Sequence, residues 1–217
     1  QLDQREPAPF VNGGAAPNPL RDLRVRQALS LAVDRNAIAS RIMDGLAVPA
    51  AQFLPDGMAG IIPGLPVLPY DPARARALLA EAGYPNGFAL TLHATNNRYV
   101  NDGRVAQALA QYFTRIGIRT EVDAMPSNVY FGRRARREFS VPMGGWAASA
   151  EETMLFFRAW LISTDRAQGY GMSNYGDWSN PAFDRPAIAA LSTMDDAARG
   201  RLMREASRIA IEEMPVL

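Results

Sequence analysis

The residues best suited to chemistry form a short run from Gly144 to Glu152, in which two glycines precede a tryptophan, a serine and two acids. The glycines follow a predicted strand, where they allow a sharp turn and let a ligand approach the backbone closely. Trp146 then lies at the carboxyl end of that strand, where open α/β sheets place their ligands. Ser149 can cap the helix that the two acids begin. The run therefore predicts a ligand contact at Trp146; the simpler alternative is a buried tryptophan that only fills the core.

A second group of polar residues follows the carboxyl end of the first predicted strand: Asn97, Arg98 and Tyr99. Since the carboxyl ends of parallel strands meet at one edge of a sheet, the topology brings this group near Trp146. Arg98 can pair with a ligand carboxylate through two hydrogen bonds, because its planar guanidinium matches that geometry. We therefore expect all three residues to face the same rim as Trp146.

Nothing in the sequence specifies an enzyme or a metal site. The chain has no cysteine, which excludes disulfides, thiolate metal ligands and cysteine catalysis. Its one histidine, His93, is interpreted as a hydrogen-bonded residue at the end of a strand rather than as a general base. No H-E-x-x-H, G-x-S-x-G or P-loop pattern is present. We therefore expect no catalytic residue, no metal and no cofactor.

The charge balance gives no support for nucleic-acid binding. The net charge is +1, whereas phosphate binding needs a concentrated basic surface. The one basic cluster, residues 133–137, is interpreted as a solvated helix end, where arginines lie near the last carbonyl groups. No apolar run approaches the roughly 20 residues that span a bilayer. No signal peptide is present, and the abrupt ends of the sequence lead us to expect a fragment of a longer protein.

One stretch, YDPARARALLAEAGYPNGFALTLH, contains a complete helix followed by a strand. Asp71 is a good N-cap residue, and Pro72 suits the first helical position because its missing N–H costs nothing there. Residues 73–82 are mostly strong helix formers, and Gly83 supplies a left-handed residue after the helix. Residues 88–92 then have the pattern of a strand.

An α/β layer continues along the chain. A predicted helix over residues 102–116 joins that strand to a second one over residues 118–124, which makes a right-handed βαβ unit with parallel strands. Ser127 is expected to cap a further helix to about residue 137, and residues 139–143 to form the next strand. The alternation of strands and helices is typical of an α/β fold.

One long loop and several helices complete the prediction. Residues 46–69 hold five prolines and three glycines, so we expect a long loop. Its apolar residues indicate that it packs against other parts of the protein. The remaining helices are predicted over residues 23–33, 36–43, 151–161, 181–191 and 196–213. Asp22, Asn180 and Asp195 are the expected N-caps of the first and the last two of these helices.

Two passages resemble the solute-binding proteins of ABC importers for peptides, nickel and related solutes, known as solute-binding family 5. The first is the stretch quoted above, and the second is NPLRDLRVRQALSLAVDRNAI. The resemblance extends from about residue 19 to residue 217 and covers only the C-terminal lobe of a two-lobed protein. It implies one lobe of a type II periplasmic-binding-protein-like fold, with a mixed, mostly parallel sheet flanked by helices.

The resemblance also implies a domain organisation and partners. Residues 1–20 become an extended segment near the hinge, and residues 21–217 become a single solute-binding lobe. A peptide or other small solute then lies in a cleft shared with the N-terminal lobe of the same protein. Closure of the lobes presents the solute to the ABC permease subunits in the membrane. The expected location is periplasmic or extracytoplasmic, with any signal peptide upstream of this chain.

Further contact residues follow from the resemblance. Dipeptide-binding members carry an aspartate a few residues after the tryptophan, and it pairs with the amino group of the ligand. This sequence has Ser149 at that place, which departs from the pattern and weakens the case for a simple dipeptide. Glu152 is the acid that can take over this role. The passage GYGMSNY followed by WSNPAFD resembles the family's N-x-x-x-YSNPxxD pattern and adds Asn174 and Tyr175.

Two other classes of function stay open at this point. The same lobe can serve as the ligand-sensing domain of a regulatory system, which the sequence on either side would distinguish. A small α/β hydrolase is the third class, but a chain with one histidine and no cysteine offers few groups for a nucleophile and its base. The identity of the ligand is not specified, because half of the implied cleft lies outside this chain.

Overall fold

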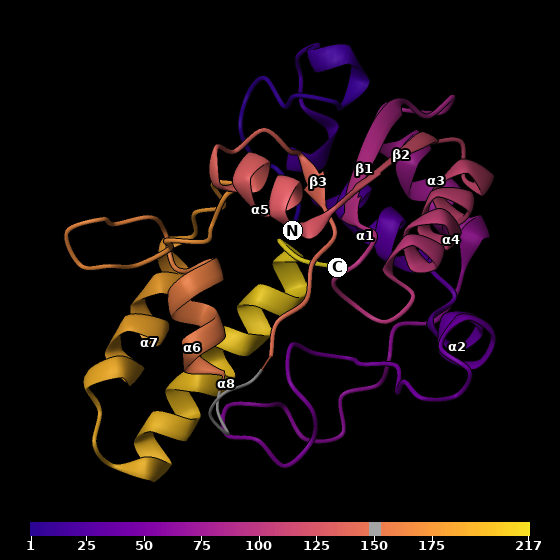
Figure 1. Cartoon of the computed structure of the whole chain (residues 1–217). Coiled ribbons are helices and arrows are strands. Elements are labelled where there is room, and N and C mark those ends of the chain that lie inside the picture. Colours follow the sequence, from indigo (N-terminus) through magenta and orange to yellow (C-terminus); the bar gives the residue numbers. More distant parts are fainter. Residues whose placement is uncertain (148–152) are drawn as a thin grey trace. The chain divides into compact units, whose positions relative to one another are not determined.

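The computed structural model describes residues 1–147 and 153–217 (Figure 1). The described chain divides into two compact units, and both chain ends, Gln1 and Leu217, belong to the first. The division into a hinge segment and a single lobe stays a prediction. The first unit contains residues 1–49, 68–145 and 216–217, and the second contains residues 50–67 and 146–215.

The first unit is built on a parallel sheet of three strands in the order β2-β1-β3. β1 (Ala89–Thr95) pairs along its whole length with β2 (Arg119–Met125). β3 (Val141–Pro142) pairs with only two residues of β1. It is shorter than predicted because residues 10 and 11 occupy the same edge of β1 near its start: the Thr91 amide donates to the Phe10 carbonyl at 2.9 Å.

The helices of the first unit begin and end close to the predicted residues. α3 (Pro72–Glu81) begins after Asp71, whose carboxylate accepts from the Arg74 amide at 2.8 Å. Its end is followed by Gly83 at φ +92°, which is the left-handed conformation that glycine adopts without strain. The other long helices of this unit are α1 (Leu23–Leu31) and α4 (Asp102–Arg115).

Two shorter helical segments differ from the prediction. α2 (Arg35–Ala37) continues as a π-helical turn, η3 (Ile38–Ile42). α5 (Ser127–Ala135) starts with Ser127 already inside the helix, so the prediction that Ser127 is the cap is wrong. The Ser127 amide donates instead to Oδ1 of Asn97, at 2.8 Å. The short 3₁₀ turns η1 (Asn12–Gly14) and η2 (Pro19–Arg21) interrupt the N-terminal segment.

The core of the first unit lies on the face of the sheet that α4 covers. Leu90 and Leu92 point from β1 into this core, where they meet apolar residues of α1, α3 and α4. The opposite face carries His93 and, at the carboxyl half of the strand, a small cluster of Met125, Tyr130 and Phe139. β1 therefore separates a large apolar core from a face with polar residues.

The second unit is helical. α6 (Met154–Phe156) continues as a π-helical turn, η4 (Phe157–Leu161). The predicted start of this helix, at Glu151, lies outside the described residues. α7 (Pro181–Ser192) and α8 (Asp196–Glu213) pack on each other and begin after the predicted caps, Asn180 and Asp195.

The long proline-rich loop packs as predicted. Within the second unit, Leu54 and Ile61 are buried. The Ser207 hydroxyl of α8 donates to the Gly60 carbonyl at 2.6 Å, and the Thr153 amide donates to the Ala59 carbonyl at 3.1 Å. Among the described residues, no helix combines the length and the apolar character needed to cross a membrane.

Candidate binding site

The loop that follows β1, residues 96–101, is held by a single carboxylate. We call this segment the rim loop. Asp102, the first residue of α4, is 4% exposed. Its Oδ2 accepts hydrogen bonds from the Thr95 hydroxyl at 2.7 Å and from the amides of Arg98 and Tyr99 at 3.0 and 3.2 Å. Its Oδ1 accepts from the Gly103 amide at 2.9 Å. One side chain thus connects the end of β1, the middle of the rim loop and the start of α4.

These hydrogen bonds determine the charge of Asp102. Burial alone raises the pKa of the carboxyl, but the bonds from the four donors outweigh it and lower the pKa below its ordinary value. Asp102 is therefore an anion at neutral pH, although its side chain has almost no contact with solvent. The role of Asp102 in holding this loop was not predicted from the sequence. An acid in the first turn of a helix is a common sequence feature, and only the structure brings the three upstream donors to it.

Both ends of the rim loop are attached to neighbouring elements. The Asn96 amide donates to the Met125 carbonyl at the end of β2, at 3.1 Å. Asn97 Oδ1 accepts from the Ser127 amide at the start of α5. At the other end, Asn101 adopts a left-handed conformation, and its Nδ2 donates to the Ile42 carbonyl at 2.7 Å. The side-chain oxygen of Asn97 is therefore occupied by a hydrogen bond within the fold, although the side chain stays exposed.

Arg98 and Tyr99 form the middle of the rim loop, where Arg98 is exposed and Tyr99 is half-buried. The Arg98 side chain is exposed, and its Cζ lies 5.6 Å from the centroid of the Tyr99 ring. The Tyr99 hydroxyl is 3.4 Å from the Gly145 carbonyl, which makes a long hydrogen bond. A Cβ atom on Gly145 would lie only 2.8 Å from the Tyr99 ring. The structure therefore brings the rim loop to Gly145, the glycine that precedes Trp146 in the sequence.

Trp146 belongs to the second unit, so its position relative to Arg98 stays a prediction. Its side chain is 38% exposed. The ring meets Phe156 and Trp160 edge-on, with centroid distances of 5.8 and 6.1 Å. Phe156 in turn stacks on Phe53 at 5.1 Å. Trp146 is therefore supported from behind by aromatic rings while part of its surface is open, which fits a ligand contact better than a core-filling role.

Three of the remaining predicted contacts do not add to this geometry. Ser149 and Glu152 lie outside the described residues. Asn174 is fully buried, and its Nδ2 donates to the Trp178 carbonyl at 2.7 Å while its Oδ1 accepts from the Trp178 amide at 3.2 Å. The structure thus gives Asn174 a role in holding a turn, and we leave it out of the site. Tyr175 is half-buried, and its contact with a ligand stays a prediction.

His93 differs from the predicted hydrogen-bonded residue. It is fully buried between two rings, stacked on Phe139 at 4.2 Å and edge-on to Phe10 at 4.8 Å. Neither ring nitrogen has a hydrogen-bond partner among the described residues, and Nε2 is 3.7 Å from Oδ2 of Asp123. Burial lowers the pKa of His93 to about 4. The imidazole is therefore neutral and enclosed at neutral pH, which is unsuited to a general base that must reach a substrate.

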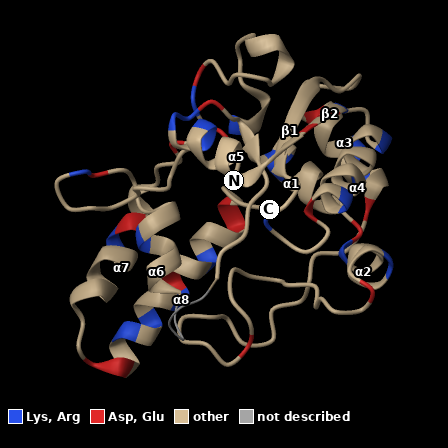
Figure 2. Cartoon of the chain, in the orientation of Figure 1, with Lys and Arg blue, Asp and Glu red and all other residues tan. Residues whose placement is uncertain are grey.

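The basic cluster of α5 is paired within the fold. Arg133 contacts Glu138 at 2.8 Å and Asp123 at 3.3 Å, and Arg136 contacts Glu138 at 2.7 Å. Arg134 is buried. Figure 2 shows acidic and basic residues interspersed along the helices rather than gathered by sign. This pairing gives no concentrated basic surface along α5 for a polyanion, but the burial of Arg134 departs from the predicted solvated helix end.

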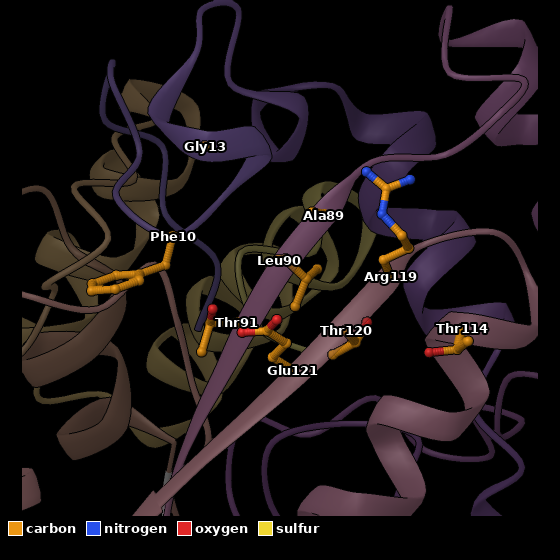
Figure 3. A pocket seen from close by; sticks show the side chains of 9 residues that line it. All are labelled: Phe10, Gly13, Ala89, Leu90, Thr91, Thr114, Arg119, Thr120 and Glu121. Carbon is orange, nitrogen blue, oxygen red and sulfur yellow. The ribbon is translucent and has the colours of Figure 1, made fainter.

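A shallow groove of about 510 Å³ lies at the other end of the sheet (Figure 3). It follows the starts of β1 and β2, where Thr91 and Glu121 lie side by side and Phe10 borders the opening. The rim loop follows the opposite, carboxyl ends of these strands, so the groove is not part of the candidate site. No group of three metal-ligating side chains occurs within residues 1–147 and 153–217.

Comparison with known proteins gives a consistent result. The family model described as "Bacterial extracellular solute-binding proteins, family 5 Middle" matches residues 9–168. The glutathione-binding protein GsiB of Salmonella choleraesuis (strain SC-B67) is 33% identical over 218 residues, which cover 95% of this chain and 40% of that protein. The chain thus spans about 40% of the length of this curated relative.

Solved structures show the same fold. HbpA2 from Haemophilus parasuis superposes with a TM-score of 0.81 at 27% identity, covering 95% of this chain and 40% of that one. A dipeptide binding protein from Pseudoalteromonas sp. SM9913, in complex with Met-Leu, gives a TM-score of 0.81 at 25% identity, covering 98% and 44%. The expected fold class, one lobe of a periplasmic-binding-protein-like α/β fold, is therefore confirmed.

Proposed function

We propose, from the premise that this chain belongs to the bacterial extracellular solute-binding proteins of family 5, that it contributes one wall of a cleft that binds a peptide or peptide-like solute. The family binds solutes and is not a family of enzymes. The proposed receptor works outside the cytoplasm, closes a second lobe over the solute and delivers it to the permease of an ABC importer. No covalent step is needed in this mechanism.

The rim loop carries the proposal. Arg98 is exposed at the carboxyl end of β1, and its backbone amide is held by the buried Asp102 carboxylate. A guanidinium on a fixed backbone loses little conformational freedom when it binds a planar carboxylate. Every linear peptide has such a carboxylate at its C-terminus. The names of two matched relatives, which mention glutathione and a dipeptide, support this class of solute.

Trp146 supplies the apolar complement. An aromatic ring that is rigid and partly open can pack against a side chain or the peptide plane of a ligand with little loss of entropy. Support from Phe156 and Trp160 keeps the ring in place before the ligand arrives. Trp146 is thus the aromatic contact that we propose for the second unit, and the remaining contacts come from the other lobe.

Closure explains how binding is reported to the membrane. A ligand shifts the open and closed states only by the difference between its affinities for them. The second lobe must therefore supply a large share of the contacts. We expect the 217-residue chain alone to bind no peptide tighter than about 1 mM, because half of the cleft contacts are absent. Isothermal titration of the isolated chain checks this, and a micromolar dissociation constant would contradict it.

The test of the proposed site uses the full-length protein that contains this chain. A thermal-shift panel of short peptides, sugars and metal chelates finds the ligand, since a ligand at a hundred times its Kd stabilises the folded protein by about 2.7 kcal/mol. Titration of the best hit against Arg98→Ala should then give an affinity at least about tenfold lower, because one charged pair is lost.

The matched control is Arg104→Ala, which removes an exposed arginine on α4. We expect it to leave the affinity unchanged. A peptide whose C-terminus is amidated should lose as much affinity for the wild type as the free acid loses for Arg98→Ala. Hits confined to sugars or chelates would keep the receptor and discard the peptide. Equal affinity for wild type and Arg98→Ala would remove Arg98 from the site.

A further inference from the structure

We infer that Asp102 is the positioning residue of the binding site, which holds Arg98 and Tyr99 in their binding geometry without contacting the ligand itself. The role in binding rests on the proposed function, whereas the role in holding the rim loop does not. The structural basis is the set of four hydrogen bonds to the Asp102 carboxylate, which join the end of β1, the rim loop and the start of α4.

Asp102 is closed to a ligand by its burial. Its side chain is almost fully buried, one oxygen accepts three hydrogen bonds and the other accepts one. A ligand ammonium group therefore has no access to it. The carboxylate instead accepts from the amides of two consecutive residues of the rim loop, Arg98 and Tyr99. Without it these amides would turn to water and the loop would sample other conformations.

The Tyr99 ring continues this support outward. The ring packs against the bare backbone of Gly145, where even a single added carbon would collide with it at 2.8 Å. The Tyr99 ring has a second contact, with Arg98, whose guanidinium lies 5.6 Å from the ring centroid. A side chain at residue 145 would push the ring away and take the support from Arg98. Gly145 is thus the second positioning residue, acting through Tyr99.

An aspartate is needed at residue 102 because all of its neighbours are donors. The Thr95 hydroxyl and the three amides all direct hydrogen toward the two oxygens. Asparagine has almost the same shape, but it replaces one oxygen by an NH₂ group and removes the charge. The asparagine side chain can accept hydrogen bonds only at its single oxygen. Its NH₂ group would then face N–H donors of the backbone. Asp102→Asn therefore loosens the loop while it preserves the size of the side chain.

The first measurement does not involve a ligand. Hydrogen exchange of the Arg98 and Tyr99 amides should be at least about tenfold faster in Asp102→Asn than in the wild type, because their acceptor is lost. The control is Asp71→Ala, which removes the cap of α3 in the same unit. It lowers stability but should leave the protection of these two amides unchanged relative to that of the β1 amides. Unchanged exchange in Asp102→Asn would overturn the inference.

The second measurement is a double-mutant cycle in the full-length protein, with the peptide found in the panel. Asp102→Asn and Gly145→Ala should each weaken binding about tenfold in the wild-type background. In the Arg98→Ala background each should cost less than about twofold, because the group that they position is gone. A general loss of folding would instead lower affinity equally in both backgrounds, and that additivity would overturn the positioning role.

The two measurements separate the two proposals. Faster amide exchange in Asp102→Asn, together with unchanged affinity in Arg98→Ala, would reject the proposed ligand contact and keep Asp102 as the residue that fixes the loop. Slow exchange in Asp102→Asn, together with weak binding in Arg98→Ala, would keep the ligand contact and reject Asp102.

Discussion

His93 and Asp102 are both buried near the carboxyl half of β1, and they are buried in opposite ways. His93 lies between two aromatic rings, with no hydrogen-bond partner for its ring nitrogens among the described residues. Asp102 accepts four hydrogen bonds. Both pKa values are lowered, but the consequences differ: His93 is held neutral by burial, whereas Asp102 is held charged by its donors.

The difference shows that hydrogen-bond partners suited to the charged form, and not depth in the protein, decide whether a buried group keeps its charge. Burial always disfavours the charged form. At Asp102 the hydrogen bonds reverse this cost, so the anion can organise a polar loop. At His93 burial outweighs the opposing effect of the nearby Asp123 carboxylate on the pKa, and the imidazole behaves as an aromatic side chain that fills space between Phe10 and Phe139. One residue supports the candidate site, and the other supports the fold.

The largest expected effect is a pH dependence that His93 imposes on stability. Unfolding raises its pKa from about 4 to the ordinary 6.5, so the unfolded state takes up a proton first as the pH falls. The native state therefore loses stability between these values. We expect the free energy of unfolding to fall by about 2 kcal/mol between about pH 7 and about pH 5. His93→Phe should remove this loss, because phenylalanine fills the same stack and does not titrate.

Urea unfolding of both proteins, followed by circular dichroism, measures this difference. Other groups titrate equally in the two proteins, so their contributions cancel when the variant is subtracted from the wild type. Parallel pH profiles for the wild type and His93→Phe would show that His93 has the same pKa in the native and unfolded states, which contradicts its being held neutral by burial.

Removal of one donor from Asp102 should have the next largest effect. Thr95→Val keeps the shape and the strand propensity of residue 95 but deletes the hydroxyl that lies 2.7 Å from Asp102 Oδ2. A hydrogen bond to a buried charge contributes about 1.5 kcal/mol, so stability at neutral pH should fall by that amount. Thr91→Val, on the same strand and half-buried, is the matched control and should stay within about 0.5 kcal/mol of the wild type.

The same pair of variants tests the charge of Asp102. Because its folded pKa is lowered, its contribution to stability is present above the ordinary value of 3.8 and is lost as the pH falls through the folded value. The difference between Thr95→Val and the wild type should therefore shrink in acid. A difference that is constant down to low pH would show that the threonine bond does not depend on the carboxylate.

Tyr130 is a buried polar residue with one hydrogen-bond partner, between His93 with none among the described residues and Asp102 with four. We expect its substitution to have an intermediate effect on stability. Its hydroxyl donates to the Met143 carbonyl at 2.6 Å, and burial raises its pKa to about 12. Tyr130→Phe should cost about 1 kcal/mol, as expected for one neutral hydrogen bond. Urea unfolding measures it, with Tyr175→Phe, a half-buried tyrosine of the other unit, as the comparison. A cost near zero would mean that a single neutral bond contributes nothing at this depth.

The ends of most elements could be predicted from the sequence because their signals are local. Asp71, Asp22, Asn180 and Asp195 all cap the helices they were expected to cap. The environments of the functional residues were not predictable in this way. The rings around His93 come from residues 10 and 139, and the donors around Asp102 come from a strand end and a loop. Such contacts depend on tertiary packing, which no local pattern encodes.

The same reason explains two errors near the candidate site. Serine commonly caps helices, but Ser127 lies inside its helix, and its amide donates to Asn97 of a loop distant in the sequence. Asn174 lies in a passage that resembles a ligand-contacting motif, yet its side-chain amide is hydrogen-bonded to the backbone of Trp178 and Ile162. In both cases a hydrogen-bond partner lies in a part of the chain that the local pattern does not include.

The smallest expected effect on stability belongs to Arg98, although it is the residue proposed to matter most for binding. Asp102 accepts from the backbone amide of Arg98 and not from the guanidinium, so Arg98→Ala keeps all four bonds to the carboxylate. What is lost is an exposed cation near the Tyr99 ring, which contributes about 0.5 kcal/mol or less. Arg98→Pro, in contrast, removes the amide hydrogen itself. It should cost about 1.5 kcal/mol, similar to Thr95→Val, because it deletes one donor to the same charge. Urea unfolding of the two variants therefore separates the side chain, which serves the ligand, from the backbone, which serves the fold. Equal losses would mean that the Arg98 side chain is itself part of the structure that holds the rim loop.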